Sequence, residues 1–147
     1  MGKCGDSPMS DSRKLVERFY ADIWNRQDFA VADEILAAVF RFRGSLGSES
    51  IGIPAFLAYV QSIHTALADY RCAIDELIAD GEHAAARMTF AGIHRGPLFG
   101  VPATGKSVAW AGAGFFRITE SRIVSLWVLG DVEGLKRQLG AAAAAPF

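Results

Sequence analysis

The chain has 147 residues, of which 51 % are hydrophobic and 21 % are charged, and its formal net charge is −1. This length and composition exclude an intrinsically disordered chain and predict one globular domain with a core of its own. A balanced charge without basic runs gives no reason to expect nucleic acid as a partner. No apolar run reaches the roughly 18–20 residues that a membrane span requires.

The N-terminus lacks the apolar core of a signal peptide, so a cytoplasmic location is expected. The two cysteines, Cys4 and Cys72, do not make a disulfide framework and are predicted to be free thiols, with Cys72 in the core. His64, His83 and His94 lie too far apart in sequence for a local metal-binding motif, so no metal site is expected.

A first helix is expected after a polar leader at residues 1–11. From Ser12 onward the apolar residues recur at helical spacing and form one broad stripe. The stripe consists of Leu15, Val16, Phe19, Tyr20, Ile23 and Trp24.

Two further helices are expected before the middle of the chain. Asp28 can cap a short second helix that runs to about residue 38. A β-prone stretch at 39–43 and a Gly/Ser loop at 44–52 follow. The third helix covers about residues 54–67, and its proline suits the first turn, where a missing N–H costs little.

Four long strands are expected after the third helix, because the apolar pattern changes there to period two. Asp80-Gly81 is a strong hairpin signal between the first two strands. The expected strands cover residues 70–79, 82–95, 106–118 and 121–131. A short C-terminal helix and a flexible tail at 141–147 complete the chain.

Helices followed by consecutive strands predict an α+β fold, in which residues 12–140 form a single domain. Its sheet is expected to be mostly antiparallel and strongly curved, with the helices on one face. The strands around Ala84 and around Ala113 carry small residues and glycines, which permit bending or close approach. Such a sheet can enclose an apolar cone, or it can pack solidly on its helices or on a second subunit. The pattern alone leaves both open.

Asp131 is the best candidate for chemistry. It ends the last strand within Ser121 to Gly140 (SRIVSLWVLGDVEGLKRQLG), and strict alternation puts it on the same face as Trp127. A carboxyl group in an apolar pocket has a raised pKa and can act as an acid. The alternative is that Asp131 caps the following helix, which lowers a carboxyl pKa.

Three arginines in the expected strands can serve either structure or ligand binding. Arg41 and Arg43 are two residues apart and therefore share a face, where they form either an anion site or a solvated surface. Arg87 lies between small and apolar residues and needs a partner if it is buried. An ion pair with Asp75 or Glu76 is the interpretation we favour.

Three segments of this chain resemble one family. They are Ser12 to Arg26 (SRKLVERFYADIWNR), Ile93 to Gly105 (IHRGPLFGVPATG) and Ile123 to Gly140 (IVSLWVLGDVEGLKRQLG). Together they look like the SnoaL-like polyketide cyclases, also called ester cyclases, which have the NTF2-like cone fold. The resemblance implies a deep pocket and a homodimer formed through the outer face of the sheet.

The resemblance also implies a reaction and a site. Studied members of this family close a ring of a hydrophobic small molecule by intramolecular aldol condensation, without metal or cofactor. Their acid/base aspartate precedes the last helix, where this chain has Asp131, and His94 belongs to the family's loop signature. By the same analogy, the substrate-binding residues are expected to be Trp127, Trp110, Phe90, Tyr20, Phe116 and Arg41.

The chain departs from the family pattern at the last strand and at the first. Many members carry an acidic residue and a histidine where this chain has Ser125 and Leu126, and a histidine in the first strand, at Phe40 to Ser45 here. Two alternatives to a cyclase therefore stay open. One is epoxide hydrolysis or isomerisation, which usually needs a second carboxylate, such as Asp75 or Glu76, or an Arg or Asn partner facing the first. The other is a non-catalytic binding or dimerisation module.

Overall fold

A continuous helical rod and two shorter helices cover one face of a sheet. The computed structural model describes residues 8–140. In it, α1 (Pro8–Arg18) leads into the π-helix η2 (Phe19–Asn25), which is followed by α2 (Ala30–Ile35) and later by α3 (Ile53–Ala66). The first helix thus begins within the predicted leader. Residues 1–7 of that leader and the predicted tail at 141–147 lie outside the described residues.

The sheet has six strands in the order β2-β1-β6-β5-β4-β3. Its members are β1 (Leu36–Arg43), β2 (Glu49–Ile51), β3 (Leu67–Asp80), β4 (His83–His94), β5 (Ser107–Thr119) and β6 (Arg122–Gly130). All neighbours are antiparallel except β1 and β6, which run parallel. The predicted α+β fold, with its mostly antiparallel sheet and its four-strand meander, is confirmed.

The second helix ends earlier than predicted. The chain is already a strand at Leu36, where helix was expected to about residue 38. The guanidinium of Arg122 donates to the carbonyls of Asp33 (2.7 Å) and Leu36 (3.0 Å), which satisfies carbonyl groups that a longer helix would use. The end of the helix is thus bonded to a residue of β6, 86 and 89 positions further along the chain.

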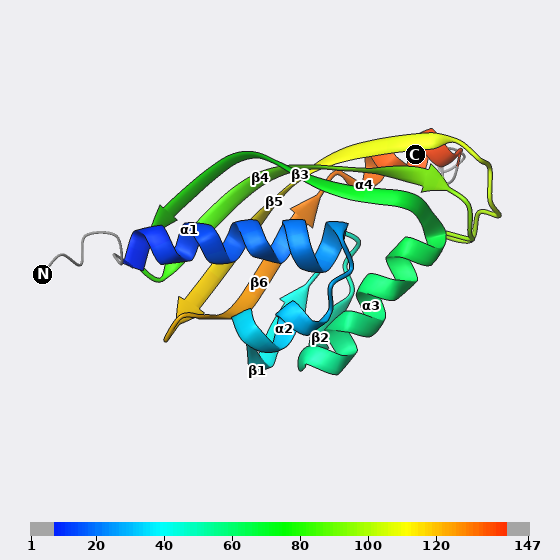
Figure 1. The fold of residues 1–147 in the computed structure, drawn as a ribbon. Helices are drawn as coiled ribbons and strands as arrows, with labels where there is room; N and C mark the ends of the chain where they lie inside the picture. Colours follow the sequence, from blue (N-terminus) through cyan, green and yellow to red (C-terminus); the bar gives the residue numbers. More distant parts are fainter. Residues whose placement is uncertain (1–7, 141–147) are drawn as a thin grey trace, which may run out of the picture.

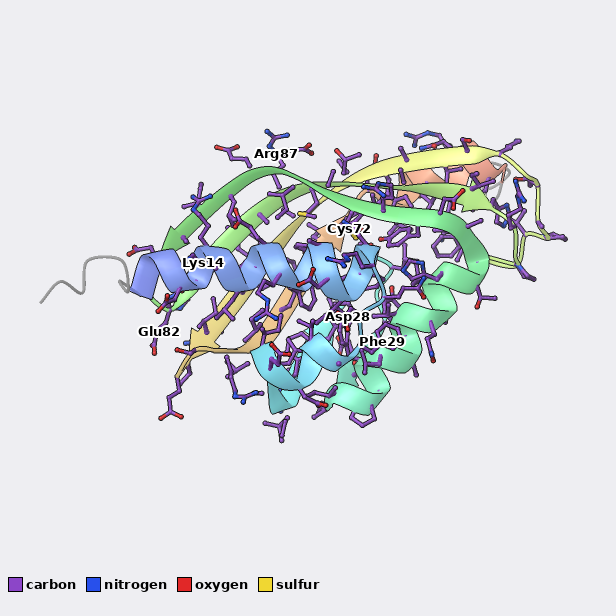
Figure 2. All side chains as sticks on the ribbon, in the orientation of Figure 1. Lys14, Asp28, Phe29, Cys72, Glu82 and Arg87 are labelled. Atoms are coloured by element: carbon purple, nitrogen blue, oxygen red, sulfur yellow. The ribbon has the colours of Figure 1, made fainter. Side chains whose placement is uncertain are left out.

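The long strands bend over α1 and η2, so that the helical rod lies in the concave side of the sheet (Figure 1). Aromatic side chains fill the space between the layers: Phe19 lies 5.5 Å from Phe56 and 5.6 Å from Phe116 between ring centroids. Figure 2 shows Cys72 between the sheet and the helical rod, and Arg87 pointing away on the outer side. None of the helices within residues 8–140 is long and apolar enough to cross a bilayer.

The last helix, α4 (Val132–Leu139), closes one end of the sheet. Strand β6 stops at Gly130, which pairs with Gly112, so the earlier part of β5 lacks a strand on that edge. The side chain of Gln138 takes that place: its Oε1 accepts the Ala109 N–H (2.9 Å) and its Nε2 donates to the Ala109 carbonyl (2.7 Å). This pairing fixes α4, and with it Asp131, against the sheet.

Candidate functional site

A small cavity lies between the sheet and the helical layer. Its volume is about 20 Å³, which is room for a water molecule. It is lined by Tyr20, Trp24, Phe42, Ser45, Tyr59, Tyr70, Cys72, Phe90, Leu126 and Val128. No charged side chain of residues 8–140 belongs to this lining. A larger ligand therefore requires the aromatic walls to move apart.

The π-helix delivers two of the lining residues, Tyr20 and Trp24. A π-helical turn widens the helix, and such turns occur often at functional sites. The end of η2 is anchored by Asn25, whose Nδ2 donates to the Cys72 carbonyl (3.0 Å) and whose Oδ1 accepts the Cys72 N–H (2.7 Å). This two-way pairing holds the π-helix against β3, so Tyr20 and Trp24 keep a fixed position over the cavity.

Aromatic rings form the far wall of the cavity. The ring of Tyr70 lies 5.5 Å from Trp24 and 6.1 Å from Trp110, and Phe90 lies 5.5 Å from Trp110, all between centroids. Trp110 is buried behind this wall, where its Nε1 donates to Ser45 Oγ at 3.4 Å. The predicted residues Tyr20 and Phe90 thus line the cavity, and Trp110 lies directly behind it.

The polar groups of the cavity are weak acids that burial keeps neutral. Burial raises the pKa of Tyr20, Tyr59 and Tyr70 well above the ordinary tyrosine value. It also raises the pKa of the Cys72 thiol to about 12. The cavity therefore offers neutral hydroxyl groups to a ligand, and no strong base.

Asp131 is exposed and does not line this cavity. Its Oδ1 accepts the Gly134 N–H at 2.9 Å, so the carboxylate caps α4. The expectation that Asp131 opens into an apolar pocket is wrong, and the alternative of a helix cap is confirmed. The physical reason is that the odd residues of this strand end, Trp127 and Leu129, are exposed as Asp131 is, so the face that strand alternation assigns to Asp131 is not the one that meets the helices. Its catalytic role stays a prediction.

Trp127 lies on the outer face of the sheet, with 47 % of its surface exposed, and not in the interior as expected. Both faces of β6 are apolar, and the even residues Leu126 and Val128 are the ones that pack into the core. Arg41 is also outside the cavity: it lines an open groove on the outer side together with Arg43 and Trp127. The shared face of Arg41 and Arg43 is confirmed.

His94 and Phe116 are buried but do not belong to the cavity lining. His94 Nδ1 accepts the Thr104 N–H at 3.2 Å and lies 2.9 Å from Thr104 Oγ1, so the ring holds the loop that follows β4. Phe116 packs edge-on against Tyr20, with centroids 5.9 Å apart, and supports its ring. Both are positioning residues in this geometry.

The acidic residues Asp75 and Glu76 are exposed on the outer side, where Arg87 contacts Asp75 at 3.9 Å and Glu76 at 3.4 Å. The predicted ion pair is confirmed. Neither residue lines the cavity, and no other carboxylate of residues 8–140 does, so the candidates for the second carboxylate of epoxide chemistry lie elsewhere. Nor does that part of the chain bring together three or more metal-binding side chains.

Eight of the ten lining residues were not predicted from the sequence as part of the site: Trp24, Phe42, Ser45, Tyr59, Tyr70, Cys72, Leu126 and Val128. Trp24 was part of the predicted helical stripe, and Cys72 was predicted to be in the core. Tyr70 is two residues before Cys72 in the same strand and therefore shares its face of the sheet. The predicted burial of Cys72 could thus have indicated that Tyr70 is buried beside it. Ser45 and Tyr59 come from a loop and a helix, and only the tertiary fold brings them to the strands.

Comparison with known proteins agrees with this architecture. The family model for the SnoaL-like polyketide cyclases matches residues 14–139. This chain belongs to the SnoaL-like polyketide cyclase family. The family match spans the helical layer, the whole sheet and α4. The resemblance inferred from three segments of the sequence is thereby confirmed, as is the NTF2-like fold. A search of curated proteins found no match to the sequence.

Solved structures of the same architecture are similar over nearly the whole chain. The protein TsrD from Streptomyces laurentii is 30 % identical, with a TM-score of 0.80 over 90 % of this chain and 96 % of that one. A protein from Jannaschia sp. CCS1, proposed to be a SnoaL-like polyketide cyclase, is 19 % identical, with a TM-score of 0.82 over 92 % and 96 %. A SnoaL-like polyketide cyclase from Agrobacterium tumefaciens is 19 % identical, with a TM-score of 0.73 over 91 % and 98 %.

Proposed function

We propose that this chain binds an uncharged hydrophobic small molecule in its interior cavity and catalyses cyclase-type carbonyl chemistry without a cofactor. The observation that carries the proposal is the cavity, which lies at the centre of a cyclase-family fold and is walled by aromatic rings and neutral hydroxyl groups. Aromatic walls with a few polar groups are typical of small-molecule sites. A charged ligand would lose its hydration there without gaining a counter-ion.

The proposed reaction is an intramolecular ring closure. A base removes a proton from the carbon next to one carbonyl group, the resulting carbanion attacks a second carbonyl carbon of the same molecule, and the oxygen formed there takes up a proton. Asp131 is the group that we propose for the proton transfers. A methyl group on the preceding residue, Gly130, would lie only 2.7 Å from the Cβ of the lining residue Ser45. Asp131 is thus the sequence neighbour of a residue that contacts the cavity lining, while its own carboxylate is exposed outside that lining.

Proton exchange tests this function without knowledge of the natural substrate. Ring closure begins with loss of a proton next to a carbonyl group, so the protein should exchange the α-protons of a bound ketone for deuterium. We expect cyclohexanone in D₂O to exchange faster with the protein than in buffer, as followed by NMR. Asp131→Asn should remove the acceleration, since the amide cannot take up the proton. Equal exchange in wild type and variant would exclude Asp131 as the base.

The second candidate function is non-catalytic binding of the same kind of ligand. The observation that favours it is the geometry of Asp131, whose carboxylate is exposed and is already used as a helix cap. On this proposal cyclohexanone binds in the cavity and its α-protons exchange at the rate found in buffer. Calorimetric binding together with the exchange experiment therefore separates the two functions.

We further propose that the chain forms a homodimer through the outer face of the sheet. One row of side chains crosses that face on neighbouring strands, in the register Ile78, Ala85, Phe115 and Trp127. Three members of this row are large apolar residues that are 47–60 % exposed. A contiguous apolar patch of this kind is typical of an interaction surface. A second copy presents the same row and can pair with it across a two-fold axis.

A further inference from the structure

The hydroxyl group of Tyr20 is buried in the cavity without a hydrogen-bond partner among residues 8–140. The residue is only 3 % exposed and belongs to the cavity lining. Buried polar atoms nearly always have partners, because an unpaired donor loses its hydration and gains nothing in return. The cavity has room for one water molecule, which can pair with this hydroxyl group, so a ligand that displaces the water must replace that hydrogen bond.

The surroundings of this hydroxyl group explain why the chain itself does not satisfy it. A methyl group on Gly114 would lie 3.3 Å from the Tyr20 oxygen, 3.1 Å from Leu126 Cδ1 and 3.5 Å from a methyl of Val128. The glycine thus leaves room beside the oxygen, and the side chains of Leu126 and Val128 that share this space are apolar. The hydroxyl group is held in place by the π-helix and by the edge-on ring of Phe116, 5.9 Å away.

By contrast, the Ser45 hydroxyl group of the cavity has a partner, since its Oγ accepts the Trp110 N–H at 3.4 Å. Because burial raises the pKa of Tyr20, its hydroxyl group keeps its proton and is a donor throughout the physiological range. A ligand that complements the site must therefore accept a hydrogen bond at this point and carry no charge.

We infer that the Tyr20 hydroxyl is the hydrogen-bond donor for the oxygen atom of an uncharged ligand, and that it makes the cavity select ketones over hydrocarbons of the same shape and over carboxylates. This inference rests on the proposed binding function and assigns its specificity to one residue. Tyr20 acts on the ligand directly, whereas Phe116 positions its ring.

Three ligands of similar shape test the selection by calorimetric titration: cyclohexanone, methylenecyclohexane and cyclohexanecarboxylate. We expect wild type to bind cyclohexanone about tenfold more tightly than methylenecyclohexane, as one satisfied hydrogen bond implies, and cyclohexanecarboxylate more weakly than either. Tyr20→Phe should abolish the preference for cyclohexanone and leave methylenecyclohexane binding unchanged. Thr89→Val is the matched control, because it removes a hydroxyl group from the outer face, where Thr89 donates to Asp75, and it should keep the preference.

Unfolding of the variants distinguishes a ligand donor from a structural one. Since the Tyr20 hydroxyl has no partner in the folded chain, Tyr20→Phe should unfold at the same denaturant concentration as wild type or a higher one. A less stable Tyr20→Phe that still prefers cyclohexanone would overturn the inference and make the hydroxyl structural. Equal binding of cyclohexanone and methylenecyclohexane by wild type would also overturn it, while leaving the binding function intact. If neither ligand bound to wild type, the proposed function itself would fail, and the inference with it.

Discussion

Trp127 and Phe115 face each other across two neighbouring strands on the outer side of the sheet, with ring centroids 6.1 Å apart. On the other neighbouring strand, Arg43 pairs with Trp127, and its guanidinium lies 5.1 Å from the centroid of the indole ring. These aromatic surfaces are exposed, although burying one such side chain is worth about 1.5–3 kcal/mol. Their exposure on the outer face of the sheet makes them the centre of the proposed dimer interface.

A charge in this row should separate the subunits. We expect Trp127→Lys and Phe115→Lys to sediment as monomers at concentrations where wild type is a dimer, because two like charges would meet near the two-fold axis. Val39→Lys is the matched control: Val39 is 68 % exposed but lies outside the row. A dimer that survives both substitutions would show that the chain associates through a different surface.

The bond from Gly134 N–H to Asp131 Oδ1 leads to opposite expectations for two substitutions. Asp131→Asn keeps a side-chain oxygen that caps α4, so its free energy of unfolding should stay within about 0.5 kcal/mol of wild type. Asp131→Ala removes the cap and should cost about 1 kcal/mol. Urea unfolding monitored by circular dichroism measures both. Equal stability of the three proteins would mean that the cap contributes nothing, and it would remove the structural account of this aspartate.

Close approach at Gly112 should make this position intolerant of any side chain. A methyl group there would lie 2.6 Å from the Phe90 ring and 2.9 Å from the Leu129 carbonyl oxygen. We expect Gly112→Ala to lose about 1–3 kcal/mol of unfolding free energy and to weaken ligand binding, since Phe90 lines the cavity. At Gly114 the nearest atoms are the ends of side chains, 3.1 Å or more away, so Gly114→Ala should cost less. The reverse order would contradict this account.

The architecture was predictable from the sequence because its signals are local. Period-two alternation, the Asp80-Gly81 turn and the change of pattern after the third helix gave the meander and the α+β class. Strand β2 was not predicted, since three residues are too few to show a period. The π-helix was not predicted either, because the stripe around Tyr20 fits an ordinary helix equally well. The widened turn becomes evident only when Asn25 is seen bonded to β3.

The candidate site was predictable only in part, because its residues are far apart in the sequence and meet only in the folded chain. Tyr20 and Phe90 were placed correctly, since each lies on the buried side of a well-defined element. Trp127 was placed on the wrong face because β6 is apolar on both sides, and alternation cannot tell which side meets the helices. Asp131 was misplaced for the same reason, since it follows the alternation of Trp127 and Leu129 and is exposed as they are.

The neutral acids of the cavity should make the fold sensitive to alkali. Burial raises the pKa of Cys72 from 9.0 to about 12, so the folded chain retains a proton that the unfolded chain releases. Stability should therefore be level up to about pH 9 and should fall from there toward pH 12, with the tyrosines adding to the loss above about pH 10. Cys72→Val should be nearly as stable as wild type at pH 7 and should lose less stability between pH 9 and 10. Urea midpoints at each pH measure this, and parallel losses in both proteins would show that the Cys72 thiol is not the group that titrates.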